Sequence, residues 1–544
     1  GIWQTVWLEP VPEARIARLR HVPDVDGGAL RLTVEGIGTG SGYVVEAVAR
    51  AGNVEVGRTS GRVGTELRLA LPAEQFKLWS PDDPFLYDLT VTLKQDGRTV
   101  DQVESYFGMR KIDMAKDDAG HLRMRLNGEF VFQVGPLDQG FWPDGLYTAP
   151  TDEALRYDIE VTKKLGFNMT RKHVKIEPAR WYYWCDKLGL LVWQDMPSGN
   201  NKTPESKKQF ETELKRLVTG MGNHPSIIMW VVFNEGWGQH DTARYCQLVK
   251  KMDPGRLVSN ASGWTDMKVG DVLDVHKYPG PGAPAPQPDR VGVLGEFGGL
   301  GLGVDGHTWA KKTWGYRGTE SSQELTRRYQ SLLSRVWQYQ ESHGMSAAVY
   351  TQITDVETEC NGLLTYDRAV IKPNVAATVA ANQGRLPKRK VVVPTSQAKG
   401  IPWRYTFDKP ADGWFKTDFD DSSWKQGPGG FGTKMTPGAV VRTEWSSDDV
   451  WLRREFEMPE MKEDGVKQDD LELTVHHDED VEIYINGVLA GSAKAFSTDY
   501  EPLDLTAKGR AALKTGKNIF AVHCKQTMGG QCIDVGIVQV IPAE

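Results

Sequence analysis

The stretch WVVFNEGWGQHD, residues 230–241, begins with four apolar residues and then stops at an Asn–Glu pair followed by glycine and tryptophan. The apolar run predicts a buried strand. A carboxylate at the end of such a strand, beside an aromatic residue, is either a paired structural group or a chemical one. If Glu235 is chemical, we expect a second carboxylate elsewhere in the chain, presented in the same way.

Length and composition indicate a multidomain globular protein. The chain has 544 residues and a net charge of -7, and this length predicts about three domains. Charges of both signs are dispersed, so neither nucleic acid nor a membrane surface is indicated as a partner. The sequence leaves the oligomeric state open, a homo-oligomer included.

The five cysteines are widely spaced, without CxxC or Cys-His clusters. This spacing argues against a zinc site and against a disulfide framework, although one bridge between Cys524 and Cys532 remains open. No stretch of about 18 apolar residues predicts a membrane-spanning helix, and the first residues carry no basic leader. A leader can be removed, so the compartment stays open, with a secreted or periplasmic location favoured over a cytoplasmic one.

Residues 1–110 alternate apolar and polar positions in short runs, which predicts an immunoglobulin-like β-sandwich. The turns DVDGG (24–28) and KQDGR (94–98) are typical of hairpins. The predicted strands are VWLEPV (6–11), ALRLTVEG (29–36), YVVEAVA (43–49) and LYDLTVTL (86–93).

Residues 111–383 alternate short apolar strands with amphipathic segments such as 152–166 and 324–344. Eight such repeats over about 250 residues predict a (β/α)8 TIM barrel, with reduced helices between strands 4 and 7 because those repeats are short. The eight predicted strands are EFVFQVG (129–135), FNMTRKH (167–173), LLVWQD (190–195), SIIMWVVFN (226–234), RLVSNAS (256–262), DVLDVHKY (271–278), VGVLGEF (291–297) and SAAVYTQ (346–352).

Residues 384–400 are rich in Pro and Lys and predict a linker. Residues 401–544 return to alternating strands and predict a second β-sandwich, a jelly roll of the galactose-binding-like type. Its aromatic segment WFKTDFDDSSWKQG (414–427) is compatible with a sugar-binding face or, as we favour, with core packing and turns.

Polar residues follow the ends of the predicted barrel strands, where a TIM barrel has its active site. They are Asp138, Arg171, His173, Asp195, Asn234, Glu235, Asn260, His276, Tyr278, Glu296 and Gln352.

The second carboxylate is Glu296, which ends predicted strand 7 as Glu235 ends strand 4. Two carboxylates that flank a glycosidic bond are the usual arrangement for sugar hydrolysis. Trp237 beside Glu235 suggests partial desolvation, which suits a general acid, whereas Arg171 and Tyr278 are placed to keep Glu296 ionised as a nucleophile. We therefore predict Glu235 as acid/base and Glu296 as nucleophile.

Five segments together resemble glycoside hydrolase family 2, the β-galactosidase, β-glucuronidase and β-mannosidase group. They are NEGWG (234–238), GEFGG (295–299), FNMTRKH (167–173), CDKLGLLVWQDMP (185–197) and the opening GIWQTVWLEPV (1–11). The resemblance implies a retaining exo-β-glycosidase without a cofactor. It also implies that Asn234 contacts the sugar 2-hydroxyl, that Tyr278 lies beside the nucleophile, and that Arg171 matches the family's strand-2 arginine.

Several departures from that pattern bear on specificity. Family members usually begin with a sugar-binding jelly roll, and this chain starts where that domain would end, so we expect it to be absent or partly replaced by the C-terminal sandwich. Tyr350 stands where β-galactosidases and β-glucuronidases carry a tryptophan, so we expect Tyr350 to contact the substrate as an altered sugar platform. Asn361 lacks the lysine partner that binds a glucuronide carboxylate, and DMPSGNN (195–201) lacks the acidic ligand of the magnesium-using enzymes. We expect no metal and a β-galactosidase-like specificity.

Other residues at the predicted mouth are candidates for binding a glycoside or oligosaccharide substrate. Asp138, His173, Asp195 and Trp264 have sugar contact or packing as alternatives, and Trp309, Trp314 and Tyr316 suggest a leaving-group subsite. The competing functions are a carbohydrate-binding protein with impaired catalysis, a family 2 enzyme acting on another β-glycoside or an α-L-arabinoside, and an inverting or metal-dependent hydrolase.

Overall fold

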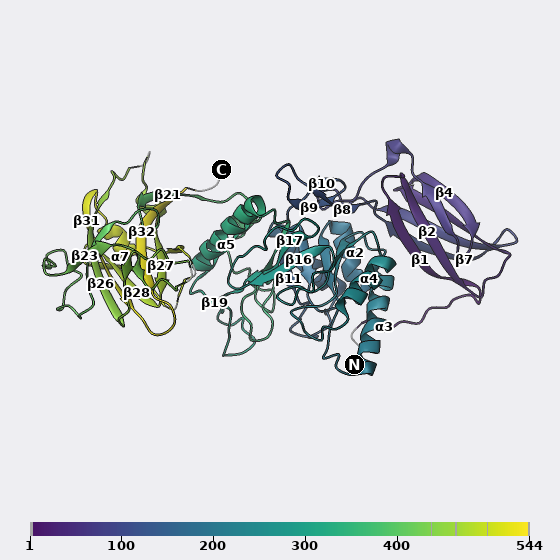
Figure 1. The fold of residues 1–544 in the computed structure, drawn as a ribbon. Helices are drawn as coiled ribbons and strands as arrows, with labels where there is room; N and C mark the ends of the chain where they lie inside the picture. The colour runs from purple at the N-terminus through teal and green to yellow at the C-terminus, as the bar shows by residue number, and fades with distance from the viewer. Residues whose placement is uncertain (1–3, 437, 463–464, 495, 498, 542–544) are drawn as a thin grey trace. The chain divides into compact units, whose positions relative to one another are not determined.

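The computed structural model describes residues 4–436, 438–462, 465–494, 496–497 and 499–541, and the chain forms two compact units, Gly1–Gly384 and Arg385–Glu544. The first unit contains a β-sandwich and a barrel, and the second contains two further sheets (Figure 1). Within the described residues no helix is both long and apolar enough to cross a bilayer. The five cysteines are buried free thiols, so the Cys524–Cys532 bridge is not formed.

The N-terminal sandwich is immunoglobulin-like, as predicted. One sheet has the order β1-β2-β5, and the other has the order β4-β3-β6-β7. Apolar side chains such as Leu32, Val45 and Leu89 fill the space between them. Its elements are β1 (Arg15–Asp24), β2 (Ala29–Ile37), β3 (Tyr43–Ala51), β4 (Val54–Arg62), β5 (Glu66–Ala70), the short η1 (Ala73–Gln75), β6 (Tyr87–Gln95) and β7 (Arg98–Phe107).

One predicted strand of this sandwich is wrong. Residues 6–11, VWLEPV, are irregular, and the first strand begins at Arg15. Pro10 and Pro12 explain the difference, because proline has no amide proton for a β-ladder and restricts the residue before it. Both predicted hairpins are present, with β1 joined to β2 and β6 joined to β7.

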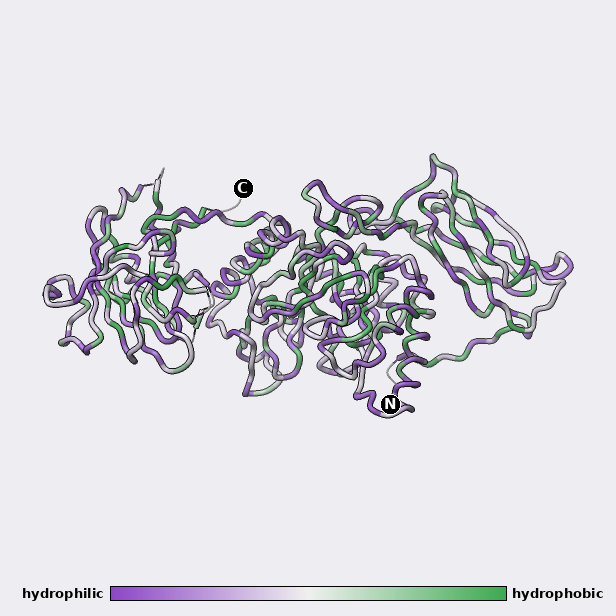
Figure 2. Tube along the Cα trace, in the orientation of Figure 1, coloured by the Kyte–Doolittle hydropathy of each residue, from purple (hydrophilic) through white to green (hydrophobic). Residues whose placement is uncertain are grey.

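The barrel has the eight parallel strands that the sequence predicts, in the order β15-β14-β13-β12-β11-β20-β17-β16. They are β11 (Gln133–Asp138), β12 (Met169–Lys172), β13 (Leu191–Asp195), β14 (Ile227–Val231), β15 (Leu257–Ser259), β16 (Val272–Lys277), β17 (Val291–Gly298) and β20 (Ala347–Thr351). Side chains such as Met169, Trp193 and Val293 fill the interior. Hydrophobic residues accordingly follow the strands, whereas the exposed helix α3 is mostly hydrophilic (Figure 2).

The helices flank these strands, and their ends carry the expected sequence signals (Figure 1). Thr203 and Ser206 form a reciprocal capping box at the start of α3, and left-handed Gly189 ends α2. As predicted from the short repeats, no helix joins β15 to β16 or β16 to β17, all within described residues. The helices are α1 (Asp152–Lys164), α2 (Ala179–Leu188), α3 (Pro204–Met221), α4 (Thr242–Met252), α5 (Ser322–Ser342) and α6 (Val375–Asn382), and the minor strands are β8 (Ile112–Lys116), β9 (Leu122–Leu126), β10 (Glu129–Phe130), β18 (Leu300–Gly301) and β19 (Arg317–Gly318).

The second unit is a sandwich of two mainly antiparallel sheets, ordered β25-β24-β32-β27-β30 and β23-β22-β26-β31-β28-β29. Its elements are β21 (Lys388–Val393), β22 (Pro402–Thr406), β23 (Lys425–Pro428), β24 (Phe431–Gly432), β25 (Thr443–Glu444), β26 (Asp449–Met458), η2 (Gln468–Asp470), β27 (Leu471–Asp478), β28 (Asp480–Ile485), β29 (Val488–Ala493), β30 (Glu501–Leu503), α7 (Ala507–Ala512), β31 (Gly516–Lys525) and β32 (Cys532–Ile541).

The structure bears on two expectations for this region. The predicted linker, 384–400, contains β21, which pairs with β32, because the β-branched run KRKVVV completes a sheet edge and buries Val393. The aromatic segment 414–427 is largely turns, and Phe415 stacks on Tyr484 with ring centroids 4.6 Å apart. This packing agrees with the interpretation that we favoured over a sugar-binding face.

Candidate active site

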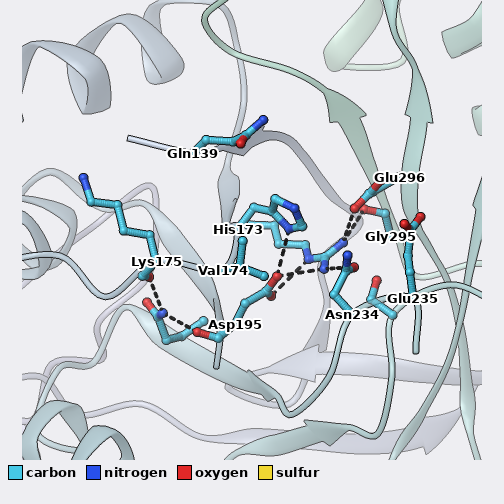
Figure 3. Close-up of polar contacts among 12 residues, drawn as sticks. Gln139, His173, Val174, Lys175, Asp195, Asn234, Glu235, Gly295 and Glu296 are labelled. Atoms are coloured by element: carbon cyan, nitrogen blue, oxygen red, sulfur yellow. Dashed lines mark hydrogen bonds and ion pairs between the residues drawn. The ribbon is translucent and has the colours of Figure 1, made fainter. Parts of the chain in front are cut away.

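Arg171 lies at the centre of the polar residues at the C-terminal ends of the barrel strands. Strands alternate their side chains, so Arg171 of β12 and its neighbour Lys172 point in opposite directions and bind different carboxylates. The Arg171 side chain is fully buried and donates to both oxygens of Asp195, at 3.1 and 2.8 Å. It also donates to Asn234 Oδ1 at 2.8 Å and to Glu296 Oε1 at 3.1 Å (Figure 3). One guanidinium thus positions side chains from three other strand ends.

Glu296 has two donors at fixed positions. Besides the Arg171 bond, Tyr278 Oη donates to Glu296 Oε2 at 2.6 Å. The Tyr278 ring stacks on Tyr316, with centroids 3.8 Å apart, so the phenol is held in place. Both oxygens of the Glu296 carboxylate are therefore held in place by hydrogen bonds, one of them from a cation.

Glu235 is placed by an unusual backbone. Its φ is +51°, and its amide donates to Ser262 O at 2.8 Å. Left-handed backbone at a residue other than glycine is strained and often marks a functional site. Burial raises the Glu235 pKa above its usual value, although Arg171 and His173 act in the opposite direction. This environment suits a carboxyl group that must keep a proton near neutral pH.

His276 lies between the two carboxylates. Its Nδ1 is 2.7 Å from Glu235 Oε1 and 3.4 Å from Glu296 Oε2, and one ligand atom from each of the three residues lies within 4.8 Å of the others. Burial lowers the His276 pKa to about 4, with Glu296 acting in the opposite direction, so the ring is neutral at pH 7. A metal cation bound by these three residues would face the Arg171 guanidinium, which opposes its binding.

The structure brings several predicted residues into this group and leaves others outside it. Asn234 and Asp195 contact Arg171, and His173 Nδ1 is 3.1 Å from Asp195 Oδ2. Asp138 instead binds Lys172 Nζ at 2.6 Å, in a buried cluster with Glu177. The carboxylate of Asp138 is therefore already paired within the protein, which supports the structural alternative.

The predicted aromatic residues also divide into a buried one and two exposed ones. Tyr350 is buried, and its hydroxyl accepts from the Leu300 amide at 3.2 Å, so it is not an exposed sugar platform. The expectation that Tyr350 contacts substrate is therefore not supported by its position. Trp237 and Trp264 are 68% and 66% exposed, and the Trp264 ring meets the His276 ring edge-on at 5.8 Å.

Sequence reasoning gave no role to several residues that the fold brings here. Ser262, Asp274 and His276 are linked by hydrogen bonds of 2.6 Å. Gln139 donates to Gln352, Gln352 donates to Asn361, and Asn361 donates to Glu359, over 2.8, 2.9 and 2.8 Å. His276 was visible as a polar strand end, but nothing in the sequence ties Glu359 to β20 or Asp274 to Glu235.

Two family models match the chain. The model of glycosyl hydrolases family 2 matches residues 14–110, and the TIM barrel domain model of the same family matches residues 149–279.

The chain belongs to glycosyl hydrolase family 2.

Relatives in this family have differing names. A putative β-glucuronidase of Formosa agariphila is 29% identical over 42% of this chain and 22% of its own length. β-Galactosidase 2 of Enterobacter cloacae is 29% identical over 50% of this chain and 28% of its own length. β-Mannosidase B of Aspergillus terreus is 29% identical over 51% of this chain and 38% of its own length. The family 2 chain therefore spans between about a fifth and two fifths of these relatives.

Solved structures share the fold. An FMN-binding β-glucuronidase of Facaelibacterium prausnitzii L2-6 aligns with a TM-score of 0.57 and 17% identity, over 96% of this chain and 75% of its own. A family 2 β-galacturonidase of Eisenbergiella tayi, bound to galacturonate, aligns with a TM-score of 0.56 and 18% identity, over 69% and 73%. At these identities the likeness extends to the fold alone.

Arg171→Met removes the charge that pairs with Asp195 and Glu296. We expect the free energy of unfolding at neutral pH to fall by about 3–5 kcal/mol, because two buried carboxylates lose their partner. Burial opposes ionisation of Asp195, but Arg171 and His173 overcome this and hold its pKa below the usual value. A depressed pKa stabilises the fold above the unfolded pKa of about 4, and that contribution is lost as pH falls through the folded pKa.

The loss in the free energy of unfolding should therefore be largest at about pH 7. It should shrink toward pH 4, because the carboxylates that lack their partner take up protons. Urea denaturation of both proteins across this range measures it. Arg180→Met, at a side chain that is 59% exposed, is the matched control and should cost little. A deficit below about 1 kcal/mol, or one that does not change with pH, would contradict the central position of Arg171.

Proposed function

We propose that this chain is a retaining β-glycosidase that removes terminal non-reducing sugars, with Glu235 as acid/base and Glu296 as nucleophile. The observation that carries the proposal is the closeness of the two carboxylates. One oxygen of Glu235 lies within 4.8 Å of one oxygen of Glu296 across the mouth of the barrel. Retaining glycosidases place these groups about 5–5.5 Å apart, whereas inverting ones need about 6.5–9.5 Å to admit a water molecule.

The first step forms a covalent intermediate. Glu296 attacks the anomeric carbon while Glu235 gives its proton to the leaving oxygen, so the glycosidic C–O bond breaks as the ester bond forms. In the second step Glu235, now ionised, takes a proton from water, and the hydroxide oxygen displaces Glu296. Arg171 and Tyr278 stabilise the Glu296 carboxylate before attack and after release.

For the sugar we propose a neutral glycoside, with a β-galactoside as the leading candidate. The absence of a lysine beside Asn361 argues against uronides, and Glu359 adds a half-buried carboxylate bonded to Asn361. Burial raises the Glu359 pKa, with Asn361 acting in the opposite direction and Glu296 also near enough to raise it. Acidic groups on this side of the pocket would repel a sugar carboxylate.

For the leaving group we propose a flat partner that stacks on Trp237 or Trp264. A general acid protonates the leaving oxygen, so the aglycone lies on the side of Glu235. Trp237 follows Glu235 by two residues, and Trp264 contacts His276, which bonds Glu235. Exposed indoles at this position offer apolar faces to an aromatic group or a second sugar ring.

The two glutamates can be tested by trapping and by substitution. A 2-deoxy-2-fluoro-β-galactosyl fluoride should glycosylate the intact protein with loss of fluoride, and peptide mass spectrometry should place the adduct on Glu296. On p-nitrophenyl β-galactoside, Glu296→Gln should lower kcat by at least about 10³-fold and Glu235→Gln by about 10²–10⁴-fold. Glu357→Gln, at an exposed position in the loop after β20, is the matched control and should leave kcat unchanged.

A panel of p-nitrophenyl glycosides, including β-glucosides, β-mannosides, β-glucuronides and α-L-arabinosides, separates the competing specificities. An adduct on any other residue would overturn the nucleophile assignment. Binding of the panel without cleavage would favour the carbohydrate-binding alternative, and loss of activity in EDTA would favour a metal-dependent one.

Trp264→Ala and Trp237→Ala should weaken hydrolysis of aryl β-glycosides and disaccharides. We expect kcat/KM on these substrates to fall by about 5–50-fold, which corresponds to one lost stacking contact. On the β-glycosyl fluoride, kcat/KM should fall by less than about threefold, because its leaving group has no ring that could stack. Trp7→Ala, at a side chain that is 71% exposed and precedes the first strand of the sandwich, is the matched control and should leave both substrates unchanged. Equal losses on the fluoride and the aryl substrate would contradict an aglycone platform.

A further inference from the structure

Asp274 is a buried carboxyl group that the reaction above does not use. It lies on β16, two residues before His276, and is 2% exposed. Its Oδ2 is 2.6 Å from Ser262 Oγ, and Ser262 Oγ is 2.6 Å from His276 Nε2. His276 Nδ1 is in turn 2.7 Å from Glu235 Oε1. A continuous chain of short hydrogen bonds thus joins Asp274 to the proposed acid/base.

The direction of this chain follows from the donors available. The Arg171 guanidinium lies 3.4 Å from His276 Nε2, and a second proton-bearing group facing this cation would be repelled, so we place the ring proton on Nδ1. Nδ1 then donates to Glu235. The lone pair of Nε2 accepts the single proton of Ser262 Oγ, so the 2.6 Å contact between Ser262 Oγ and Asp274 Oδ2 has a donor only if Asp274 carries a proton. This arrangement requires Asp274 to be protonated.

We propose that Asp274 is a positioning residue which, as a neutral acid, orders Ser262 and His276 so that His276 donates to Glu235 Oε1 and leaves Oε2 for the leaving oxygen. The inference rests on the acid/base role proposed for Glu235. Ionised Asp274 would instead take the Ser262 proton, and His276 would then carry its proton on Nε2. Nδ1 would accept from Glu235, which draws the proton of the acid away from the substrate.

The electrostatics of the site are consistent with a neutral Asp274. Burial raises the Asp274 pKa to about 7, with Arg171 and hydrogen bonds to the ionised carboxylate opposing and Glu296 adding to the rise. The other titratable or charged groups that face this series of hydrogen bonds are Glu235 itself, His173 just after β12 and Asp195 on β13. Asp274 is therefore largely protonated below neutral pH and loses its proton as pH rises through about 7.

The test compares Asp274→Asn with Ser262→Ala. Asparagine keeps a donor toward Ser262 at every pH, so Asp274→Asn should keep kcat within about threefold of the wild type at about pH 6. The ratio of its kcat to that of the wild type should then rise by about fivefold or more toward pH 8, where the hydrogen bonds from Asp274 to Glu235 reverse their direction in the wild type. Ser262→Ala breaks the chain and should lower kcat on phenyl β-galactoside by about tenfold or more, but on the 2,4-dinitrophenyl glycoside by less than about threefold.

Asp289→Asn, at an exposed position, is the matched control and should track the wild type at each pH. A ratio that does not change with pH, or an Asp274→Asn variant as impaired as Ser262→Ala at about pH 6, would overturn the proposal.

A readout without substrate separates this result from failure of the proposed function. The infrared difference titration of wild type against Asp274→Asn should show a protonated carboxyl at about pH 6, and its absence would overturn the proposal even if no glycoside is cleaved.

Discussion

The ion pairs of Arg171 are the constraint on which the active site depends. A buried guanidinium is costly unless its donors are satisfied, and here Asp195, Asn234 and Glu296 satisfy them from the ends of β13, β14 and β17. Because the guanidinium is planar and rigid, it fixes the directions of its partners as well as neutralising them. The barrel brings the strand ends together, and Arg171 turns that proximity into defined geometry.

Around this cation the two proposed catalytic carboxylates have different surroundings. Glu296 receives donors from Arg171 and Tyr278, whereas Glu235 contacts neutral His276 and is partly desolvated. Two carboxyl groups in unlike environments are what an acid and a nucleophile require at one pH. The left-handed backbone of Glu235 and the stacked Tyr278–Tyr316 pair lie at the two sides of this difference, one at each carboxylate.

Much of this arrangement follows from sequence pattern, and the failures have physical causes. The barrel strands were predictable because each is a short apolar run that ends on polar residues, and Glu235, Glu296, Arg171 and Tyr278 lie at such ends. Asp138 and Tyr350 share that signal, but their partners Lys172 and Leu300 become neighbours only through tertiary packing. Ser262, Asp274 and Glu359 carry no local signal, since their roles depend on hydrogen bonds between different loops and strands.

The stereochemistry of the first-formed product tests the central claim most directly, because it reports whether Glu235 and Glu296 work as a closely spaced pair. Proton NMR during hydrolysis of an aryl β-galactoside, or of the best substrate of the panel, shows the anomer released before mutarotation. The account predicts that the β-anomer appears first, through two displacements at one carbon. Release of the α-anomer first would mean a single displacement by water and would contradict the assignment of Glu296 as the nucleophile.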